Sequence, residues 1–530
     1  APHVVDAVRK YIEAKYGTDK LYQGGLTVNT AIDLNLQRAA VNALREGLGA
    51  LDKRHGFRGR IGFQPVKSEP SRLDTLSVTL KTGESFNAQV LTVGDRFLTV
   101  RGRGLVGHIL GADLAWALGN HKENKGALSG PKKLGELFQP GDIIKVRLKN
   151  YDKTRRMAAF ALDQTPLVEG AVVCIEPYTG FVRAMVGGYN FMEGGFNHAT
   201  EAKRQPGSSF KPFIYGSALE NGFTPASILM DLPVIHEKSA LEKKSWKPMN
   251  YDGRFLGPMR LRTALALSRN VVTVGLLEKI GLDKAIDFAR RAGITSNISY
   301  DLTTALGSSV VTPLELTSAY ATFASQGMRT EPILIRSIVD GNGKVLEHFE
   351  PKPVQTIDPT TAFLVSSLLK SVVQEGTGSG AKRLGKPLAG KTGTTNNFVD
   401  AWFVGYAPSL VTGVWVGYDN SKASLGNKET GARVALPIWV SVMASALYNK
   451  PAEDFRPTET VSFLNIDPES GLLAREGQKN AILDAFRKGT EPTQYADAAK
   501  KSTTNFYNLD QGSAEDTQGA KINSDNRFRP

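Results

Sequence analysis

The sequence predicts an α+β protein with an antiparallel sheet flanked by helices and a small inserted β-barrel. Apolar strands in the stretch 169–190 and in the runs at 400–419 bracket a long, mostly helical region at 208–330. Between 73 and 165 the chain changes to short β-branched runs separated by glycines and a Pro-Gly-Asp turn, which is typical of a small barrel. The 530 residues are too many for one ordinary core, so several domains are expected.

The first 83 residues are predicted to be a connecting segment of helix, strand and helix. Residues 24–32 have strand composition, and residues 33–51 place apolar side chains near the helical period. Asp33 stands where a helix N-cap is expected. Residues 52–72 are polar and interrupted by Gly and Pro, which indicates a loop or linker.

The barrel is predicted at 84–165, with the oligonucleotide/oligosaccharide-binding type as one option. A barrel by itself implies no ligand. The main α+β domain is predicted at 166–450. Its helix at 312–327 begins with Thr312, Pro313 and Glu315, a capping box with proline at the first helical position.

A second capped helix is expected at 358–376 and another helix at 436–448. Residues 451–530 form a C-terminal extension. From about 490 this extension becomes polar and poor in aromatic side chains, which predicts a segment without fixed structure.

The net charge of +13 favours acidic partners. The positive charge is nevertheless spread along the chain, and we find no arginine-rich arm and no nucleic-acid motif, so a solvated basic surface is the expected interpretation. No run reaches the roughly 18 apolar residues of a membrane-spanning helix, so the chain as given is expected to be soluble. The first residues do not resemble a signal peptide, and a natural precursor could carry an anchor upstream.

A single cysteine, Cys174, excludes an internal disulfide and any cysteine metal cluster. It lies in an apolar, strand-like run, which favours a buried structural thiol. The seven histidines show no metal-ligand spacing, so neither a metal nor another cofactor is expected.

Three short motifs carry the chemistry. Ser208 stands three residues before Lys211, so on a helix the hydroxyl and the amine would share a face. Ser268 and Asn270 form a Ser-x-Asn on a link between apolar helices. A Lys-Thr-Gly-Thr run follows, made of Lys391, Thr392, Gly393 and Thr394. In this order the three motifs are the signature of penicillin-interacting serine enzymes.

Each motif alone is weak, and each recurs in the chain. Ser379 precedes Lys382 by three residues in a glycine-rich stretch that we interpret as a loop. A second Lys-Thr-Gly lies at 81–83, before any nucleophile, and a Ser-Asp-Asn lies at 524–526 in the predicted unstructured end. Order and setting therefore favour the set that begins with Ser208.

With these motifs on hand, the chain resembles a bifunctional class A penicillin-binding protein of the 1A type. "QPGSSFKPF", "PMNYDGRFLGPMRLRTALALSRNVV", "ALGSSVVTPLELTSAYATFA" and "GKTGTTNNFVDAWFVGY" all resemble the transpeptidase domain of that family. "LTVNTAIDLNLQRAA" and "DKRHGFRG" resemble the segment that joins its two catalytic domains. The fold implied is that of penicillin-binding transpeptidases and serine β-lactamases. The family also has an N-terminal glycosyltransferase domain; its motifs are missing here, so a portion without that domain is expected and glycosyl transfer is not.

The resemblance implies a serine D-Ala-D-Ala transpeptidase that cross-links peptidoglycan stem peptides, with carboxypeptidation as a side reaction and covalent inhibition by β-lactams. It implies a location at the periplasmic face of the bacterial inner membrane, with activator proteins possible, and no nucleic acid. Ser208 would be the nucleophile, Lys211 its base and Ser268 the proton relay. The resemblance also implies that Asn270 binds the substrate amide and that Lys391, Thr392 and Thr394 bind its terminal carboxylate. Gly393 would let the substrate lie against the strand as an added strand. The backbone N–H groups of Ser208 and Thr394 would form the oxyanion hole.

Two alternatives stay open at this point. A serine β-lactamase shares the triad but needs a glutamate to activate the deacylating water, and Glu315 is the nearest choice, although the capping box explains it better. A penicillin-sensing or wall-binding module would need no catalysis, and the presence of both Ser208 and Lys211 argues against it.

Overall fold

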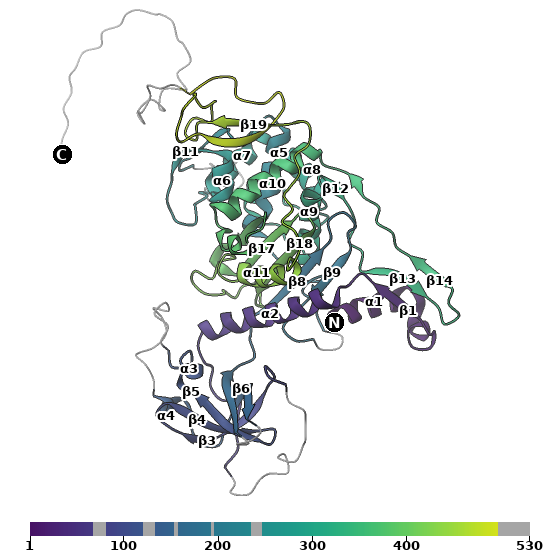
Figure 1. Ribbon diagram of the computed structural model, residues 1–530, viewed down its shortest axis with the longest axis vertical. Helices are drawn as coiled ribbons and strands as arrows, with labels where there is room; N and C mark the ends of the chain where they lie inside the picture. The colour runs from purple at the N-terminus through teal and green to yellow at the C-terminus, as the bar shows by residue number, and fades with distance from the viewer. Residues whose placement is uncertain (67–80, 120–132, 153–156, 192–194, 235–245, 497–530) are drawn as a thin grey trace, which may run out of the picture.

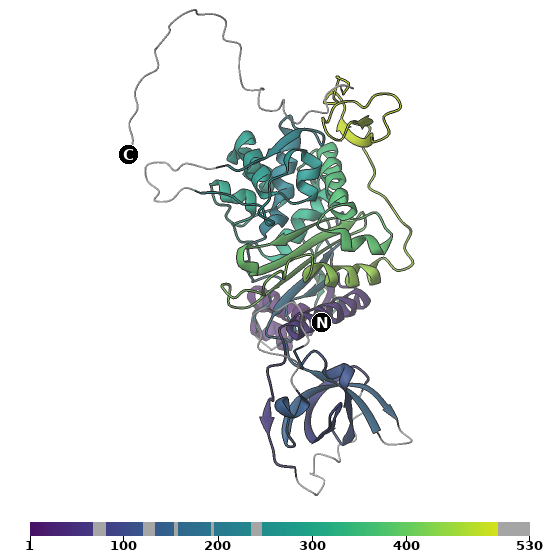
Figure 2. The ribbon, with the colours of Figure 1, turned by 90° about the vertical axis from the view of Figure 1, so that its left-hand side faces the viewer.

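The computed structural model describes residues 1–66, 81–119, 133–152, 157–191, 195–234 and 246–496. A larger α+β body and a small barrel lie on opposite sides of the long helix α2 (Leu34–Arg54) (Figure 1). The view turned by 90° shows the same separation (Figure 2).

A five-stranded antiparallel sheet forms the centre of the larger body, as predicted. Its strand order is β16-β17-β18-β8-β9, which makes β16 an edge strand. The strands are β8 (Glu169–Ile175), β9 (Val182–Val186), β16 (Ala389–Thr394), β17 (Asp400–Ala407) and β18 (Leu410–Gly417). Every residue of β17 and β18 is buried, because helices cover both faces of the sheet.

One face of the sheet is covered by a group of helices that build the main hydrophobic core. They are α5 (Lys211–Glu220), α6 (Leu261–Ala266), α7 (Asn270–Ile280), α8 (Leu282–Ala292), α9 (Pro313–Ala324) and α10 (Pro359–Gln374). The predicted capping box is confirmed, since Thr312 Oγ1 accepts from Glu315 N and the Glu315 carboxylate accepts from Thr312 N. The helix predicted at 358–376 likewise begins behind a capping carboxylate, Asp358.

The other face of the sheet is covered by α2 and α11 (Ala435–Ala446). The Asp33 carboxylate caps α2, accepting from Asn35 N and Leu36 N. The two helices pack closely: a Cβ on Gly47 would lie 2.2 Å from Ile438 Cγ1. The residues of α2 were predicted to belong to a connecting segment. In the structure they pack on the sheet and form part of the core.

Cys174 is buried between these layers, as predicted, and Thr412 Oγ1 donates to its sulfur at 3.4 Å. Burial raises the pKa of this thiol to about 12. It is therefore a structural thiol in an apolar environment.

The barrel predicted from sequence is present. Its strands are β2 (Gly62–Phe63), β3 (Ser85–Val93), β4 (Phe97–Gly102), β5 (Leu105–Leu110), β6 (Asp142–Asp152) and β7 (Met157–Asp163), accompanied by α3 (Gly111–Leu114) and α4 (Leu134–Leu137). The sheet closes because β7 pairs with both β5 and β6. The barrel has its own core, separate from the cores of the larger body.

The remaining elements, which are short apart from the helix α1, lie around the larger body. They are α1 (Pro2–Gln23), β1 (Thr27–Thr30), β10 (Ile228–Asp231), β11 (Gly257–Arg260), β12 (Met328–Arg329), β13 (Ile335–Val339), β14 (Val345–His348), β15 (Val354–Gln355), β19 (Val461–Ile466), β20 (Ile482–Arg487) and the 3₁₀ turns η2 (Gly207–Phe210), η3 (Leu302–Leu306), η4 (Ser379–Leu384) and η5 (Asn396–Phe398). The predicted unstructured end falls mainly on 497–530, outside the described residues. Within the described ranges no helix is both long and apolar enough to cross a bilayer.

Candidate active site

Ser208 lies on a 3₁₀ turn, η2, that leads directly into α5. The sequence predicted an α-helical first turn; the α-helix instead begins at Lys211, whose N–H donates to Ser208 O. Because a 3₁₀ turn has three residues per turn, the side chains of Ser208 and Lys211 are eclipsed on one face. Ser209, about 240° from Lys211 on the same turn, is buried and donates to Pro206 O at 2.6 Å.

The edge strand β16 lies against this turn. A Cβ on Gly393 would lie 2.4 Å from Pro206 O and 2.8 Å from Ser209 Oγ. Gly207 has a positive φ of 55°, and a Cβ there would lie 2.7 Å from Thr394 O. Two glycines therefore allow the strand and the turn η2 to touch. The first requirement on Gly393 is this contact with the protein, whereas the sequence suggested a bed for substrate.

Lys211 is fully buried and donates two short hydrogen bonds. Its Nζ lies 2.7 Å from Ser268 O and 2.7 Å from Asn270 Oδ1, with Ser268 Oγ at 3.4 Å. Among the described residues the Ser208 side chain has no hydrogen bond, to Lys211 or to any other group. Burial, reinforced by the charges of Lys391 and Arg269, lowers the pKa of Lys211 well below its usual value.

Lys391 reaches the same serine from the opposite side. Its Nζ donates to Ser268 Oγ at 2.8 Å and to Thr392 O at 3.1 Å. Burial lowers the pKa of this lysine to about 7. The structure therefore brings Lys211, Ser268, Asn270 and Lys391 into one hydrogen-bonded cluster behind Ser208.

Ser268 occupies the link between α6 and α7 with a positive φ of 58°. This left-handed conformation is uncommon for a residue with a side chain and is found more often at functional sites. It turns the Ser268 carbonyl toward Lys211, while the hydroxyl lies between the two lysines.

The threonines of β16 have partners on the protein. Thr392 Oγ1 lies 2.6 Å from Thr377 Oγ1, and Thr394 Oγ1 accepts from Gly431 N at 3.0 Å. Because the Thr394 oxygen accepts this bond, its hydroxyl proton is left to donate to a ligand. Thr395 N donates to Asp400 O at 3.2 Å. In an antiparallel ladder the preceding N–H, that of Thr394, then points away from β17. Its oxyanion role stays a prediction.

The second copies of the three motifs do not belong to this cluster. Ser379 and Lys382 are both exposed and belong to the 3₁₀ turn η4, so the interpretation of that stretch as a loop was wrong. Ala381 of this turn is buried in the core on the α2 and α11 side of the sheet, which holds the stretch in place. Lys81 stands just before β3 of the barrel, and Ser524 is outside the described residues.

Sequence reasoning missed the side chains that hold the Ser268–Asn270 loop. Asp231, at the end of β10, and Asn250 are both buried beside this loop, and Arg269 bonds to Asp231. No short motif marks these residues. Asn250 lay within one of the segments that carried the family resemblance, and that was the available signal.

Two aromatic rings contact each other near the cluster of Lys211, Ser268, Asn270 and Lys391. Tyr251, which is largely exposed, and Phe398, on η5, have ring centroids 6.0 Å apart in an edge-to-face arrangement. Tyr251 follows the segment that contacts Asn270, and Phe398 follows the end of β16. Loops from two sides therefore meet beside the catalytic cluster.

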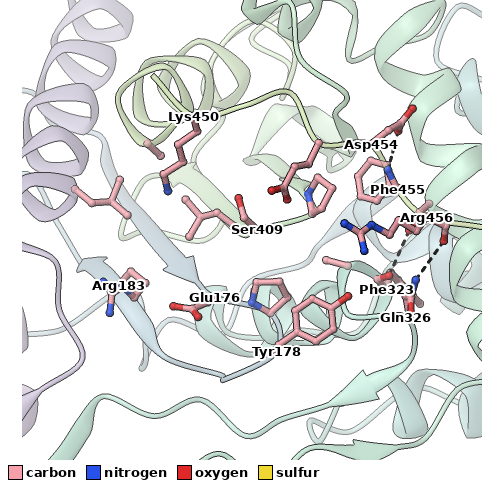
Figure 3. Close-up of a pocket in the computed structure, with 18 of the residues that line it drawn as sticks. Glu176, Tyr178, Arg183, Phe323, Gln326, Ser409, Lys450, Asp454, Phe455 and Arg456 are labelled. Carbon is pink, nitrogen blue, oxygen red and sulfur yellow. Dashed lines mark hydrogen bonds between the residues drawn. The ribbon is translucent and has the colours of Figure 1, made fainter. Parts of the chain in front are cut away.

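A large cavity of about 870 Å³ lies elsewhere, where the turns of the central sheet meet the segment after α11 (Figure 3). Its lining includes Glu176, Tyr178, Ser409, Lys450 and Arg456, and none of the predicted site residues. The cavity is therefore at the opposite end of the sheet from the predicted site residues. Hydrogen bonding and buried charge identify the site better than volume does.

The chain is similar to known proteins over most of its length. The chain is 34% identical over 545 residues to penicillin-binding protein 1A of Pseudomonas aeruginosa, covering 93% of this chain and 65% of that protein. It is 36% identical over 495 residues to penicillin-binding protein 1A of Aquifex aeolicus, covering 92% of this chain and 63% of that protein. The chain thus spans slightly less than two thirds of the length of these curated relatives.

Among solved structures, the fold is similar to the crystal structure of penicillin-binding protein 1A from Haemophilus influenzae. The TM-score is 0.81 at 29% identity, over 93% of this chain and 77% of that chain. Residues 170–444 match the family described as the penicillin-binding protein transpeptidase domain, and these residues include every member of the cluster around Ser268. The chain therefore belongs to the penicillin-binding protein transpeptidase family.

Proposed function

We propose that this chain is a serine D-Ala-D-Ala transpeptidase that cross-links peptidoglycan stem peptides through an acyl-enzyme on Ser208. The observation that carries the proposal is the buried Lys211. Its side chain leaves the turn on the same face as that of Ser208, and burial favours the neutral form of its amine, as a general base requires. Family membership and the similarity to proteins named penicillin-binding protein 1A support the same reaction.

In the first half-reaction the Ser208 oxygen attacks the carbonyl carbon between the last two D-alanines, and its proton passes to Lys211. The C–N bond then breaks. The leaving D-alanine takes a proton through the Ser268 hydroxyl, which lies within hydrogen-bond range of both lysines.

In the second half-reaction the amino group of another stem peptide attacks the ester carbonyl of the acyl-enzyme. A new amide bond forms, the bond to Ser208 breaks, and a proton returns to the serine oxygen. Water in place of the amine gives carboxypeptidation. A β-lactam follows the first half-reaction only, because its leaving nitrogen stays attached to the acyl group.

The carboxylate of the substrate would bind to the β16 residues. Lys391 supplies positive charge when protonated, and the free hydroxyl proton of Thr394 supplies a directional donor. Asn270 has its Oδ1 toward Lys211 and its Nδ2 on Met249 O, so contact with a substrate amide would need the side chain to exchange a partner. Since the substrate is cell-wall peptide, we propose that the reaction takes place outside the cytoplasm.

The proposal is tested by locating a penicillin adduct by mass spectrometry after proteolysis. The adduct should be on Ser208 alone, and Ser208→Ala should abolish it. Ser209→Ala removes a buried hydroxyl that bonds only to Pro206 O, so this control should lose about 1 kcal/mol of stability but keep the adduct. An adduct on another serine, or an unchanged yield in Ser208→Ala, would overturn the mechanism.

The two rival functions give different outcomes in one further assay. With a stem-peptide donor and an amine acceptor, a transpeptidase forms the cross-linked amide, whereas a sensing module forms none. A β-lactamase would release the penicilloyl group quickly and turn over. A long-lived adduct together with amide formation is the result we expect.

A further inference from the structure

We infer that Asp231 and Asn250 are positioning residues for acylation, which hold the Ser268–Asn270 loop in the conformation that Lys211 requires. This inference rests on the proposed function. It concerns two buried side chains on separate segments, one at the end of β10 and the other on the stretch before β11.

Asn250 closes the N-terminal end of α7 from outside the helix. Its Oδ1 accepts from Asn270 N at 2.8 Å and from Val271 N at 3.3 Å. The first N–H groups of a helix have no partner within it, and the residue before α7, Arg269, has no capping side-chain bond. Asn250 therefore acts as the cap in place of a local residue.

The neighbouring backbone fixes the orientation of the catalytic amide. Asn270 Nδ2 donates to Met249 O at 2.9 Å. With its NH₂ group held there, Asn270 must turn its Oδ1 the other way, toward Lys211 Nζ at 2.7 Å. The segment that carries Asn250 thus sets one of the two acceptors for the lysine.

Asp231 holds this segment and the loop together. Its Oδ1 accepts from Asn250 Nδ2 at 2.7 Å. Its Oδ2 accepts from Arg269 Nε at 2.9 Å and from Leu256 N at 3.0 Å. One fully buried carboxylate therefore bonds to the cap residue Asn250, to Arg269 of the loop, and to the backbone of Leu256 in the segment between them.

Arg269 is the anchor of the loop itself. It is nearly buried, binds Asp231 and Asp252, and also donates to Arg254 O. Its neighbour Ser268 has the strained positive φ, which persists only when the surroundings hold it. Without this anchor we expect Ser268 to relax, which would move its carbonyl and hydroxyl away from the two lysines.

The donor–acceptor pattern allows a reciprocal exchange. Both oxygens of Asp231 accept from donors, so Asp231→Asn must set its NH₂ group against either the Asn250 NH₂ or the Arg269 and Leu256 N–H groups. Asn250→Asp would place two carboxylates at hydrogen-bond distance. Each single variant therefore breaks part of this hydrogen-bond network. The double variant Asp231→Asn/Asn250→Asp restores one donor facing one acceptor and keeps an oxygen for the α7 N–H groups. It gives up the second bond of the Asn250 NH₂ group, which donates to Arg254 O at 2.9 Å, so the recovery is partial.

The measurement is the second-order rate constant for acylation by a fluorescent penicillin, together with the label per chain at saturation. The saturating label counts folded, competent sites, so a role in stability alone would change that count and leave the rate constant unmoved. We expect each single variant to lose about 10- to 100-fold in rate constant, the range for a catalytic group misplaced by about 1 Å. The double variant should recover at least about tenfold of this loss.

Asp484→Asn is the matched control. Asp484 is another fully buried carboxylate bonded to an arginine, Arg262, and it touches none of the catalytic cluster. It should lower the melting temperature while its acylation rate constant stays within about threefold of the parent, since no catalytic group moves.

If Asp231→Asn does not fold, Asp252→Asn is the alternative variant that tests the same anchor, Arg269. Its carboxylate is 44% exposed and binds the same Arg269, so folding should survive and the rate should fall about two- to fivefold. Folded single variants that acylate at the parent rate, or a folded double variant with no recovery, would overturn the inference. A parent chain that is not labelled at all would instead overturn the proposed function.

Discussion

At the scale of single residues, the site depends on two lysines that are both fully buried. Burial penalises the charged form of each, and the nearby charges of Lys391 and Arg269 lower the pKa of Lys211 further. Neighbouring positive charge acts on Lys211 in addition to burial, whereas burial alone acts on Lys391, so in the resting enzyme the proton is expected on Lys391. This division gives one neutral amine for the serine and one cation for a carboxylate.

The acylation rate should therefore show a bell-shaped dependence on pH. It rises with pH while Lys211 loses its proton, because only the neutral amine can accept a proton from Ser208. It falls as the pH passes through the Lys391 pKa of about 7, because the cation is then lost. The check is the second-order acylation rate constant of the free enzyme measured between pH 5 and 10.

Lys391→Arg tests the assignment of the falling limb. A guanidinium stays charged across this range, so the rate should no longer fall near neutral pH, even if the longer side chain lowers the maximum. A falling limb that stays where it was would assign it to another group.

At the scale of secondary-structure elements, the contact between β16 and η2 places the nucleophile. The turn is also held from behind, since Tyr320 OH donates to Ser209 O at 2.5 Å and Trp402 Nε1 donates to Gln205 O at 2.8 Å. Strand, turn and helix are therefore fixed relative to one another before any substrate binds. Small shifts at this contact should change acylation more than stability.

Gly393→Ala should lower the acylation rate constant by about 100-fold, because the new methyl group would push β16 away from Pro206 O and Ser209 Oγ. Gly275→Ala is the matched control. Gly275 lies within α7 with open space at its Cβ, so alanine should stabilise the helix by about 1 kcal/mol. Equal acylation rates in the two variants would show that the close approach has no role in catalysis.

The hydrogen bonds of Glu315 at the N-terminal end of α9 favour a structural role for this residue over a catalytic one. Its carboxylate accepts from Thr295 N at 2.6 Å, Ser296 N at 2.6 Å and Ser296 Oγ at 2.6 Å, in addition to closing the capping box. We expect Glu315→Gln to lower the melting temperature and to leave the lifetime of the penicilloyl adduct unchanged. An adduct that lives much longer in this variant would instead identify Glu315 as a deacylation base.

At the scale of the whole molecule, the barrel and the helices α5, α6 and α7 are on opposite sides of α2 (Figures 1 and 2). The attachment is local. Asp52, at the end of α2, accepts from Arg58 Nη1, from Gln164 Nε2 and from Leu167 N, so both connections to the barrel end beside one carboxylate. The barrel core contains none of the residues that pack behind Ser208.

Replacing residues 60–162 by a short Gly/Ser linker should leave the acylation rate constant within about twofold of the parent. The cut keeps Arg58 and Gln164, because a buried Asp52 without partners would destabilise α2. Circular dichroism and melting establish that the shortened chain is folded. A large loss of labelling in that folded chain would mean that the barrel shapes the active site.

The sequence by itself determined what local patterns and motif order can specify. The capping box of Thr312 and Glu315, apolar periodicity, and β-branched runs between glycines are short-range signals, so the helices, the antiparallel sheet and the barrel could be predicted. The family could likewise be predicted, because residue type and motif order restrict the reaction class, whereas the catalytic roles of Ser208, Lys211, Ser268 and Lys391 stay predictions.

Only the tertiary structure decided how these residues are held. The packing of α2 on the sheet, the contact of Gly393 with the nucleophile turn, and the link from Asp231 through Asn250 to Asn270 join residues far apart in the chain. The depressed pKa values of the lysines also depend on burial by distant segments. Desolvation and hydrogen-bond direction are properties of three-dimensional surroundings, and no spacing along a sequence encodes them.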